Sequence, residues 1–217
     1  MSSIDRAAIQ TFGIPRLLLM EHAGLALARC AITLVSEPSK PILVCCGTGF
    51  NGGDGLAAAR HLYNQGHSLR VVLAGDRAQV REEPATYVTM VERLGIPVKQ
   101  CPSIEAIKQV ESWMGECGLI IDALLGIGIR GSVREPMASL IGRMNRSGKP
   151  IVAADLPSGL DADRGLPQGI AIQATMTVAF GLPKQGCFLR DGPAYTGTLV
   201  VDSITIPPML LETGKDR

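Results

Sequence analysis

Seven short apolar runs, separated by amphipathic stretches, constrain the fold of this chain more than any other feature. The runs are nearly continuous in hydrophobicity rather than alternating, as strands buried on both faces of a sheet require. They cover residues 42–46, 69–74, 96–98, 119–121, 151–154, 176–180 and 199–201. Helical periodicity recurs between them, around 55–65, 84–94, 103–115 and 133–146. This repeated order predicts an α/β fold of three layers, with a doubly wound, mainly parallel sheet between two layers of helices.

The two ends of the chain depart from this alternation. The first forty residues predict helices, with one apolar face over residues 4–9, a break at Gly13-Ile-Pro15, and a second helical stretch from Leu17 to Leu34. We therefore expect an N-terminal helical lead-in before the sheet. The last two apolar runs have no long helix between them and are expected to finish the sheet at an edge. Nothing resembling a linker or a repeat divides residues 1–217, so we expect a single domain.

Charge and hydropathy exclude several classes of partner. The 21 Lys and Arg residues balance 20 Asp and Glu residues, for a formal net charge of +1, and they form no basic run. We therefore expect no binding to nucleic acid or to a membrane surface. No apolar run approaches the roughly 20 residues that a membrane-spanning helix needs, and residues 1–6 lack the pattern of a secretory signal. A cytoplasmic protein is expected.

The cysteines and histidines do not indicate a transition-metal site. The six cysteines show no Cys-x-x-Cys spacing, and Cys45 and Cys46 lie inside an apolar run. We expect all six to pack as small hydrophobic side chains, without a disulfide framework.

Ligands of parallel α/β sheets bind beyond the carboxyl ends of the strands, so the loops that follow strands are the place to look for function. The first such loop, residues 47–55, is rich in glycine and opens a helix at about residue 55. Backbone N–H groups and a helix N-terminus together favour a phosphate. Two alternatives stay open. Asp54 could simply cap the helix, and Gly47, Gly49 and Gly52 also match the fingerprint of dinucleotide-binding dehydrogenases.

Two further loops begin with a carboxylate. Asp122 directly follows the apolar run 119–121 and leads into a second glycine-rich loop, in which Arg130 is a candidate counter-charge for a phosphate. Turn capping by Asp122 and a solvated Arg130 are the alternatives. Asp155 follows the run 151–154 and precedes a rigid Pro-Ser-Gly turn, which would hold its carboxylate at the edge of the core and suit it to proton transfer. Asp161 and Asp163 are interpreted as turn residues.

Asn51, Asp122 and Ser158 offer oxygen ligands from three neighbouring loops. Such a set suits a hard cation with flexible coordination, for example a monovalent alkali ion. The sequence does not choose the ion.

Several of these segments resemble the NAD(P)H-hydrate epimerase family. The motifs are Phe50-Asn-Gly-Gly-Asp-Gly55 and its continuation to His61, Asp122-Ala-Leu-Leu-Gly-Ile-Gly128, Arg134-Glu-Pro136, and Asp155-Leu-Pro-Ser-Gly-Leu-Asp161. Residues 4–9, 19–24 and 180–186 extend the match over nearly the whole chain.

The resemblance implies a Rossmann-like fold and an isomerase that inverts the hydroxylated C6 of hydrated NADH or NADPH (NADHX or NADPHX). It implies a potassium ion held by Asn51, Asp122 and Ser158, and Asp155 becomes the candidate catalytic acid/base. A homodimer is expected, with NAD(P)H-hydrate dehydratase as the functional partner. The substrate contacts it implies come from Phe50, Asn51, Gly52, Gly53 and Asp54, from Gly126, Ile127, Gly128, Ile129, Arg130, Gly131 and Ser132, and from Asp155.

Two departures from the family pattern keep alternative functions open. Family members usually carry Asn where this chain has Phe50, and Thr where it has Ile127. The loss of these polar side chains favours a non-catalytic nucleotide-binding or scaffold module of the same fold. An NAD(P)-dependent dehydrogenase is supported by the glycine pattern and by Asp76, which follows the second apolar run near the place of a ribose-binding acid. It lacks a convincing set of residues for hydride transfer.

Overall fold

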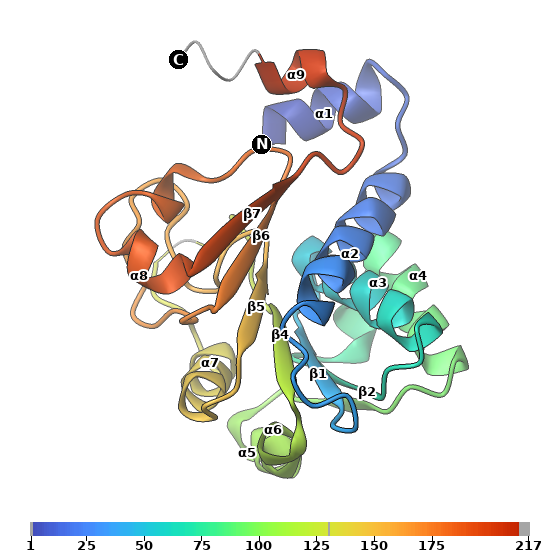
Figure 1. The fold of residues 1–217 in the computed structure, drawn as a ribbon, viewed down its shortest axis with the longest axis vertical. Helices are drawn as coiled ribbons and strands as arrows, with labels where there is room; N and C mark the ends of the chain where they lie inside the picture. The colour runs from blue at the N-terminus through green and yellow to red at the C-terminus, as the bar shows by residue number, and fades with distance from the viewer. Residues whose placement is uncertain (1, 130, 213–217) are drawn as a thin grey trace.

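Parallel strands form a single sheet through the centre of the molecule (Figure 1). The computed structural model describes residues 2–129 and 131–212, and within them seven strands lie in the order β3-β2-β1-β4-β5-β6-β7, with every pair parallel. The predicted α/β class with a doubly wound sheet is confirmed. The chain changes direction between β1 and β4, and such switch points form ligand crevices at the carboxyl ends of the strands. The strands are β1 (Ile42–Cys46), β2 (Leu69–Leu73), β3 (Val98–Gln100), β4 (Leu119–Ala123), β5 (Ile151–Ala154), β6 (Met176–Phe180) and β7 (Thr198–Asp202).

Helices cover both faces of the sheet (Figure 1). One face carries α2 (Arg16–Ile32), α3 (Phe50–Asn64) and α4 (Glu82–Arg93), and the other carries α5 (Ile104–Ile107), α6 (Glu111–Glu116) and α7 (Met137–Arg146). The ends of the described chain meet, because α1 (Ser2–Gln10) lies beside α9 (Pro208–Glu212). The short elements are η1 (Arg77–Gln79), η2 (Lys108–Val110), η3 (Gln185–Cys187) and α8 (Gly192–Thr196).

Strand β1 shows why the apolar runs are continuous. Successive side chains of a strand point to opposite faces. Ile42, Val44 and Cys46 pack under α2, α3 and α4, whereas Leu43 and Cys45 pack against the opposite layer. Every residue of β1 is buried, and burial of such a side chain contributes roughly 1.5–3 kcal/mol.

The N-terminal lead-in is confirmed and forms part of the helical layer. Helix α2 packs closely on α3, and the small residues of the second helical stretch make this approach possible. A Cβ atom on Gly24 would lie 2.4 Å from the Cβ of Ala57. The lead-in therefore comes close to the carboxyl ends of the strands, where α1 and α2 take part in the site described below.

Several predicted boundaries are wrong, chiefly beside glycine and proline. The helix expected around 55–65 begins at Phe50, and the strand expected at 96–98 lies at Val98–Gln100, because Pro97 has no N–H for the ladder. The helix expected over 103–115 is divided into α5, η2 and α6, and the one expected over 133–146 begins at Met137, after the cis peptide bond before Pro136.

In the described part of the chain, no helix has both the length and the hydrophobicity to cross a membrane.

Candidate active site

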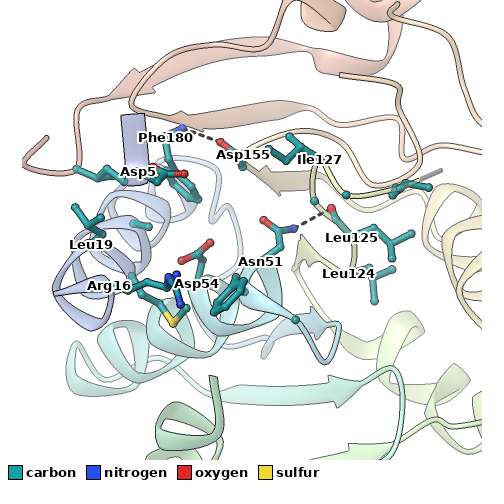
Figure 2. Close-up of a pocket in the computed structure, with 18 of the residues that line it drawn as sticks. Asp5, Arg16, Leu19, Asn51, Asp54, Leu124, Leu125, Ile127, Asp155 and Phe180 are labelled. Atoms are coloured by element: carbon teal, nitrogen blue, oxygen red, sulfur yellow. Dashed lines mark hydrogen bonds between the residues drawn. The ribbon is translucent and has the colours of Figure 1, made fainter. Parts of the chain in front are cut away.

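A cavity of about 630 Å³ opens at the carboxyl ends of β1, β4 and β5. On the side of the sheet it is lined by the loop and helix after β1, by the loop after β4 and by Asp155 after β5. On the other side it is lined by α1 and α2 (Figure 2). Its volume lies in the range of small-molecule and cofactor sites. The sheet therefore places a ligand-sized cavity where the strand order predicts one.

The glycine-rich segment after β1 enters α3 earlier than expected. Gly49 is the N-cap, so residues 50–54 lie on the helix rather than in a loop. The prediction of a loop rested on the poor helix propensity of glycine, but Gly52 is needed for a close approach, since a Cβ there would lie 1.9 Å from the carbonyl oxygen of Gly47. Gly49, Phe50 and Asn51 line the cavity. A helix N-terminus at a cavity wall can bind an anionic group through its free N–H groups and dipole.

The three predicted cation ligands lie close together. Ser158 donates to both carboxylate oxygens of Asp122, from Oγ at 2.6 Å and from its backbone N–H at 2.8 Å. Asn51 Nδ2 donates to the carbonyl oxygen of Leu125 at 3.0 Å, and the N–H of Leu125 donates to Ser158 Oγ at 2.9 Å. The sequence predicts that Asp122 follows the strand, but Asp122 lies within β4. A carboxylate is tolerated inside this buried strand because these donors satisfy it.

The carboxylate of Asp122 is fully buried, with an exposed fraction of 0%. Burial raises its pKa to about 6, against the opposing effect of the donors from Ser158 and Leu124. No Lys, Arg or His within residues 2–129 and 131–212 forms an ion pair with it. The hydroxyl oxygen of Ser158 and the carbonyl oxygen of Leu125 thus lie beside a buried acid without a cationic partner in the described chain, and Asn51 joins them through its amide nitrogen.

Asp155 follows β5 directly and lines the cavity, as predicted. Its backbone has a φ of +65°, a left-handed conformation that is strained for a residue with a Cβ and is typical of functional sites. The N–H of Phe180 donates to Oδ1 at 3.1 Å (Figure 2). The same oxygen forms an ion pair with Lys184, so the environment of Asp155 is more polar than the apolar edge that the sequence predicts.

Lys184 is a site residue that the prediction missed. Its side chain is only 6% exposed, lines the cavity, and also donates to the carbonyl oxygen of Leu182 at 3.3 Å. The available signal was its place shortly after the end of β6, because the loop after this strand also meets the ligand edge of the sheet.

Two more carboxylates, Asp54 and Asp5, line the same cavity (Figure 2). The pKa of Asp54 is raised well above its usual value, first by burial and then by the charges of Asp155 and Asp5. Burial is also the main reason why the pKa of Asp5 is raised. Asp54 does not cap α3, because it lies one turn inside the helix. Asp5 had no signal in the sequence, since α1 precedes the sheet by some thirty residues and reaches the site only through the tertiary fold.

Only some of the remaining predicted substrate contacts line the cavity. Gly126, Ile127, Gly128 and Ile129 line the cavity. Gly52 and Gly53 face protein atoms instead, of Gly47 and of Met20. Gly131 and Ser132 are not among the residues that line the cavity, and Arg130 lies outside the described residues. Phe50 and Ile127, the two departures from the family pattern, are each 45% exposed.

Other acidic residues singled out in the sequence have structural contacts. Asp76 accepts the N–H of Ala78 at 2.8 Å through Oδ1 and caps η1, so this carboxylate has a structural contact in the turn after β2. Asp161 accepts N–H groups of Asp163 and Arg164 and is a turn residue, as expected.

The fold and the position of the cavity define a Rossmann-like α/β domain. The family model described as "YjeF-related protein N-terminus" matches residues 16–186, and the chain belongs to this family. The resemblance inferred from the sequence is thereby confirmed.

Relatives and a solved structure agree with this assignment. The chain is 44% identical to the bifunctional NAD(P)H-hydrate repair enzyme Nnr of Pyrobaculum aerophilum over 94% of its length, and it spans 40% of that enzyme. It is 36% identical to the NAD(P)H-hydrate epimerase of Limosilactobacillus fermentum, covering 93% of this chain and 92% of the relative. The crystal structure of yeast ynu0 superposes with a TM-score of 0.85 at 26% identity, over 99% of this chain and 90% of that one. Because the chain spans about 40% of the bifunctional relatives, the single domain over residues 1–217 stays a prediction.

Proposed function

We propose that this protein is an NAD(P)H-hydrate epimerase, an isomerase that interconverts the R and S forms of hydrated NADH and NADPH. The observation that carries the proposal is the single cavity in which the N-terminus of α3 and the Asp155–Lys184 pair occur together. The helix N-terminus suits the diphosphate of a dinucleotide. The pair supplies a fixed carboxylate for the reacting ring. Similarity to the Limosilactobacillus epimerase over 92% of that relative supports the same activity.

The chemistry requires a proton donor and a stabilised cation. C6 of the hydrated ring is bonded to both a hydroxyl and the ring nitrogen. Protonation of the leaving hydroxyl releases water and leaves a positive charge shared by C6 and the nitrogen, and a water molecule then adds to the opposite face. In this proposal Asp155 exchanges a proton with the oxygen at C6 and its negative charge stabilises the cation. Lys184 and the N–H of Phe180 fix the position of the Asp155 carboxylate.

We also propose a potassium ion held by Asn51, Asp122 and Ser158. The donor set fits such an ion, because it consists of oxygen atoms that include a buried carboxylate without a cationic partner in the described chain. An ion held by these residues would supply a positive charge close to Asn51, which lines the cavity. Asn51 and Ser158 themselves join the start of α3 and the turn after β5 to the loop after β4, through the backbone of Leu125.

The remaining proposals concern partners and location. A dehydratase acting on one epimer, on the same chain or another, would consume the product, and the names of the bifunctional relatives support this link. The six cysteines are free thiols, the state that a reducing compartment maintains, and this supports the cytoplasm. The homodimer stays a prediction, which sedimentation at micromolar concentration tests.

A chromatographic assay of separated R and S hydrates tests the proposed activity against its alternatives. An epimerase equilibrates the two hydrates without change in total reduced nucleotide. Net oxidation would identify a dehydrogenase, and interconversion at the spontaneous rate would identify a binding or scaffold module.

A further inference from the structure

We propose that Asp54 is a second catalytic residue, which exchanges a proton with the hydroxyl on one face of the ring while Asp155 serves the opposite face. The inference rests on the proposed function and goes beyond the substrate contact that the family resemblance implies for Asp54. It assigns two carboxylates of one cavity to the two halves of an inversion.

The position of Asp54 in α3 directs it into the cavity. It lies three residues after Asn51 and four after Phe50, so the three share one face of the helix. All three line the cavity. Figure 2 shows the carboxylates of Asp54 and Asp155 entering the cavity from two different elements, α3 and the end of β5. A ring between them would present one face to each acid.

The two carboxylates differ in their partners. Asp155 is held by Lys184 and by the N–H of Phe180. Asp54 has neither a hydrogen-bond donor nor an ion-pair partner at its carboxylate among the residues that the structure describes. Asp54 is half-buried, and a carboxylate at the wall of a cavity without such partners favours its neutral form more than one held by a cation. Two carboxyl groups of one cavity that differ in this way in their partners are suited to the complementary roles of acid and base.

The electrostatic surroundings of Asp54 agree with a neutral carboxyl. Burial raises its pKa first, and the negative charges of Asp155 and Asp5 raise it further, whereas Lys184 acts in the opposite direction. The dipole of α3 has its main effect within the first turn, and Asp54 lies beyond it. Four other charged groups line the cavity with Asp54, namely Asp5 on α1, Arg16 on α2, Asp155 after β5 and Lys184 after β6. Two further titratable groups, Cys46 on β1 and Tyr87 on α4, interact with Asp54 electrostatically but do not line the cavity.

The proposed steps balance without a redox partner. The Asp54 carboxyl donates its proton to the departing oxygen, the C6–O bond breaks, and the lone pair of the ring nitrogen forms a double bond to C6. Water leaves, and Asp54 becomes a carboxylate. A water molecule then adds to C6 from the other face, the double-bond pair returns to nitrogen, and the proton of that water passes to Asp155. Proton exchange with solvent restores both acids, and the reverse reaction uses them in exchanged roles.

The test is Asp54→Asn in the full chain, with Asp54→Glu as the conservative variant. We expect Asp54→Asn to lower kcat by about 10²-fold or more, the scale for removal of a positioned acid. Its KM, and its Kd for NADH, should stay within about threefold of wild type, since the amide keeps the size of the side chain. Asp54→Glu should recover part of kcat because it restores a carboxyl. Asp191→Asn, at an exposed position away from the cavity, is the matched control and should behave as wild type.

The pH profile of kcat gives a second readout that does not depend on any variant. Because Asp54 must be protonated to act as the acid, kcat of the wild type should fall as pH rises through its raised pKa. Asp54→Asn should lose this limb. A KM increase with unchanged kcat would show that Asp54 only binds substrate. Loss of folding and NADH binding together, with no basic limb in the wild type, would show a structural role, and both results overturn the inference. A wild type that does not equilibrate the hydrates would instead refute the proposed function.

Discussion

Lys184 reaches back from the loop after β6 and forms an ion pair with Asp155, at the end of the neighbouring strand β5. The lysine side chain is 6% exposed and the aspartate side chain 16%. Removal of one member of a buried pair leaves an uncompensated charge, whereas an exposed pair contributes little. The pair therefore fixes the carboxylate that the proposed reaction uses. Breaking it should lower both the unfolding free energy and the turnover by measurable amounts.

Lys184→Gln should lower both stability and turnover. We expect a loss of about 1–3 kcal/mol in unfolding free energy, less than for a fully buried pair because solvent reaches Asp155, and at least a tenfold lower kcat because the carboxylate loses its fixed position. Denaturant titration and the epimerase assay measure the two effects. Lys40→Gln, which removes an exposed pair with Glu37, is the control, and an equal stability loss in both variants would contradict the account.

Potassium should stabilise the protein through Asp122. An ion present at 100 times its Kd adds about 2.7 kcal/mol to the unfolding free energy. We expect the melting temperature to be higher in potassium chloride than in choline chloride at equal ionic strength, and this difference to disappear in Asp122→Asn. Equal melting temperatures of the wild type in the two salts would rule out the proposed potassium site.

Phe50→Asn, which installs the residue usual in the family, tests how the substrate is held. The guanidinium of Arg16 lies 4.7 Å from the centre of the Phe50 ring, and Arg16 also pairs with Glu82 and Glu83. Loss of the ring should cost about 0.5–1 kcal/mol of stability. We expect the Kd for NADH to change less than about threefold, because backbone N–H groups at the start of α3 would hold the phosphates. A change above tenfold would show that the side chain at position 50 governs binding.

The fold was largely predictable, because strands buried on both faces require uninterrupted apolar runs. The bounds of β1, β5 and β6 match the predicted runs to the residue. Errors arose where tertiary packing overrides local propensity. The glycines after Gly49 favour a loop by propensity, yet they lie in α3 because Gly52 packs on Gly47.

The candidate site was predictable only in part. Asp122 and Asp155 stand out because each occurs at the end of an apolar run, which is a pattern along the chain. Lys184 has a weaker signal, because it stands a few residues beyond the end of its apolar run, and Asp5 has none, because it reaches the cavity only through contacts between distant segments. The ion pair between Asp155 and Lys184 is likewise a property of the folded site and not of any motif.

The most direct test of the account starts from the pure R hydrate of NADH and follows the appearance of the S hydrate by chromatography, with wild type and Asp155→Asn in parallel. The account predicts rapid equilibration by the wild type at constant total reduced nucleotide. It also predicts a rate lower by about 10²-fold or more for Asp155→Asn, with NADH affinity within about tenfold and an unchanged fold. A wild type no faster than the spontaneous reaction, or an Asp155→Asn variant with normal turnover, would contradict it.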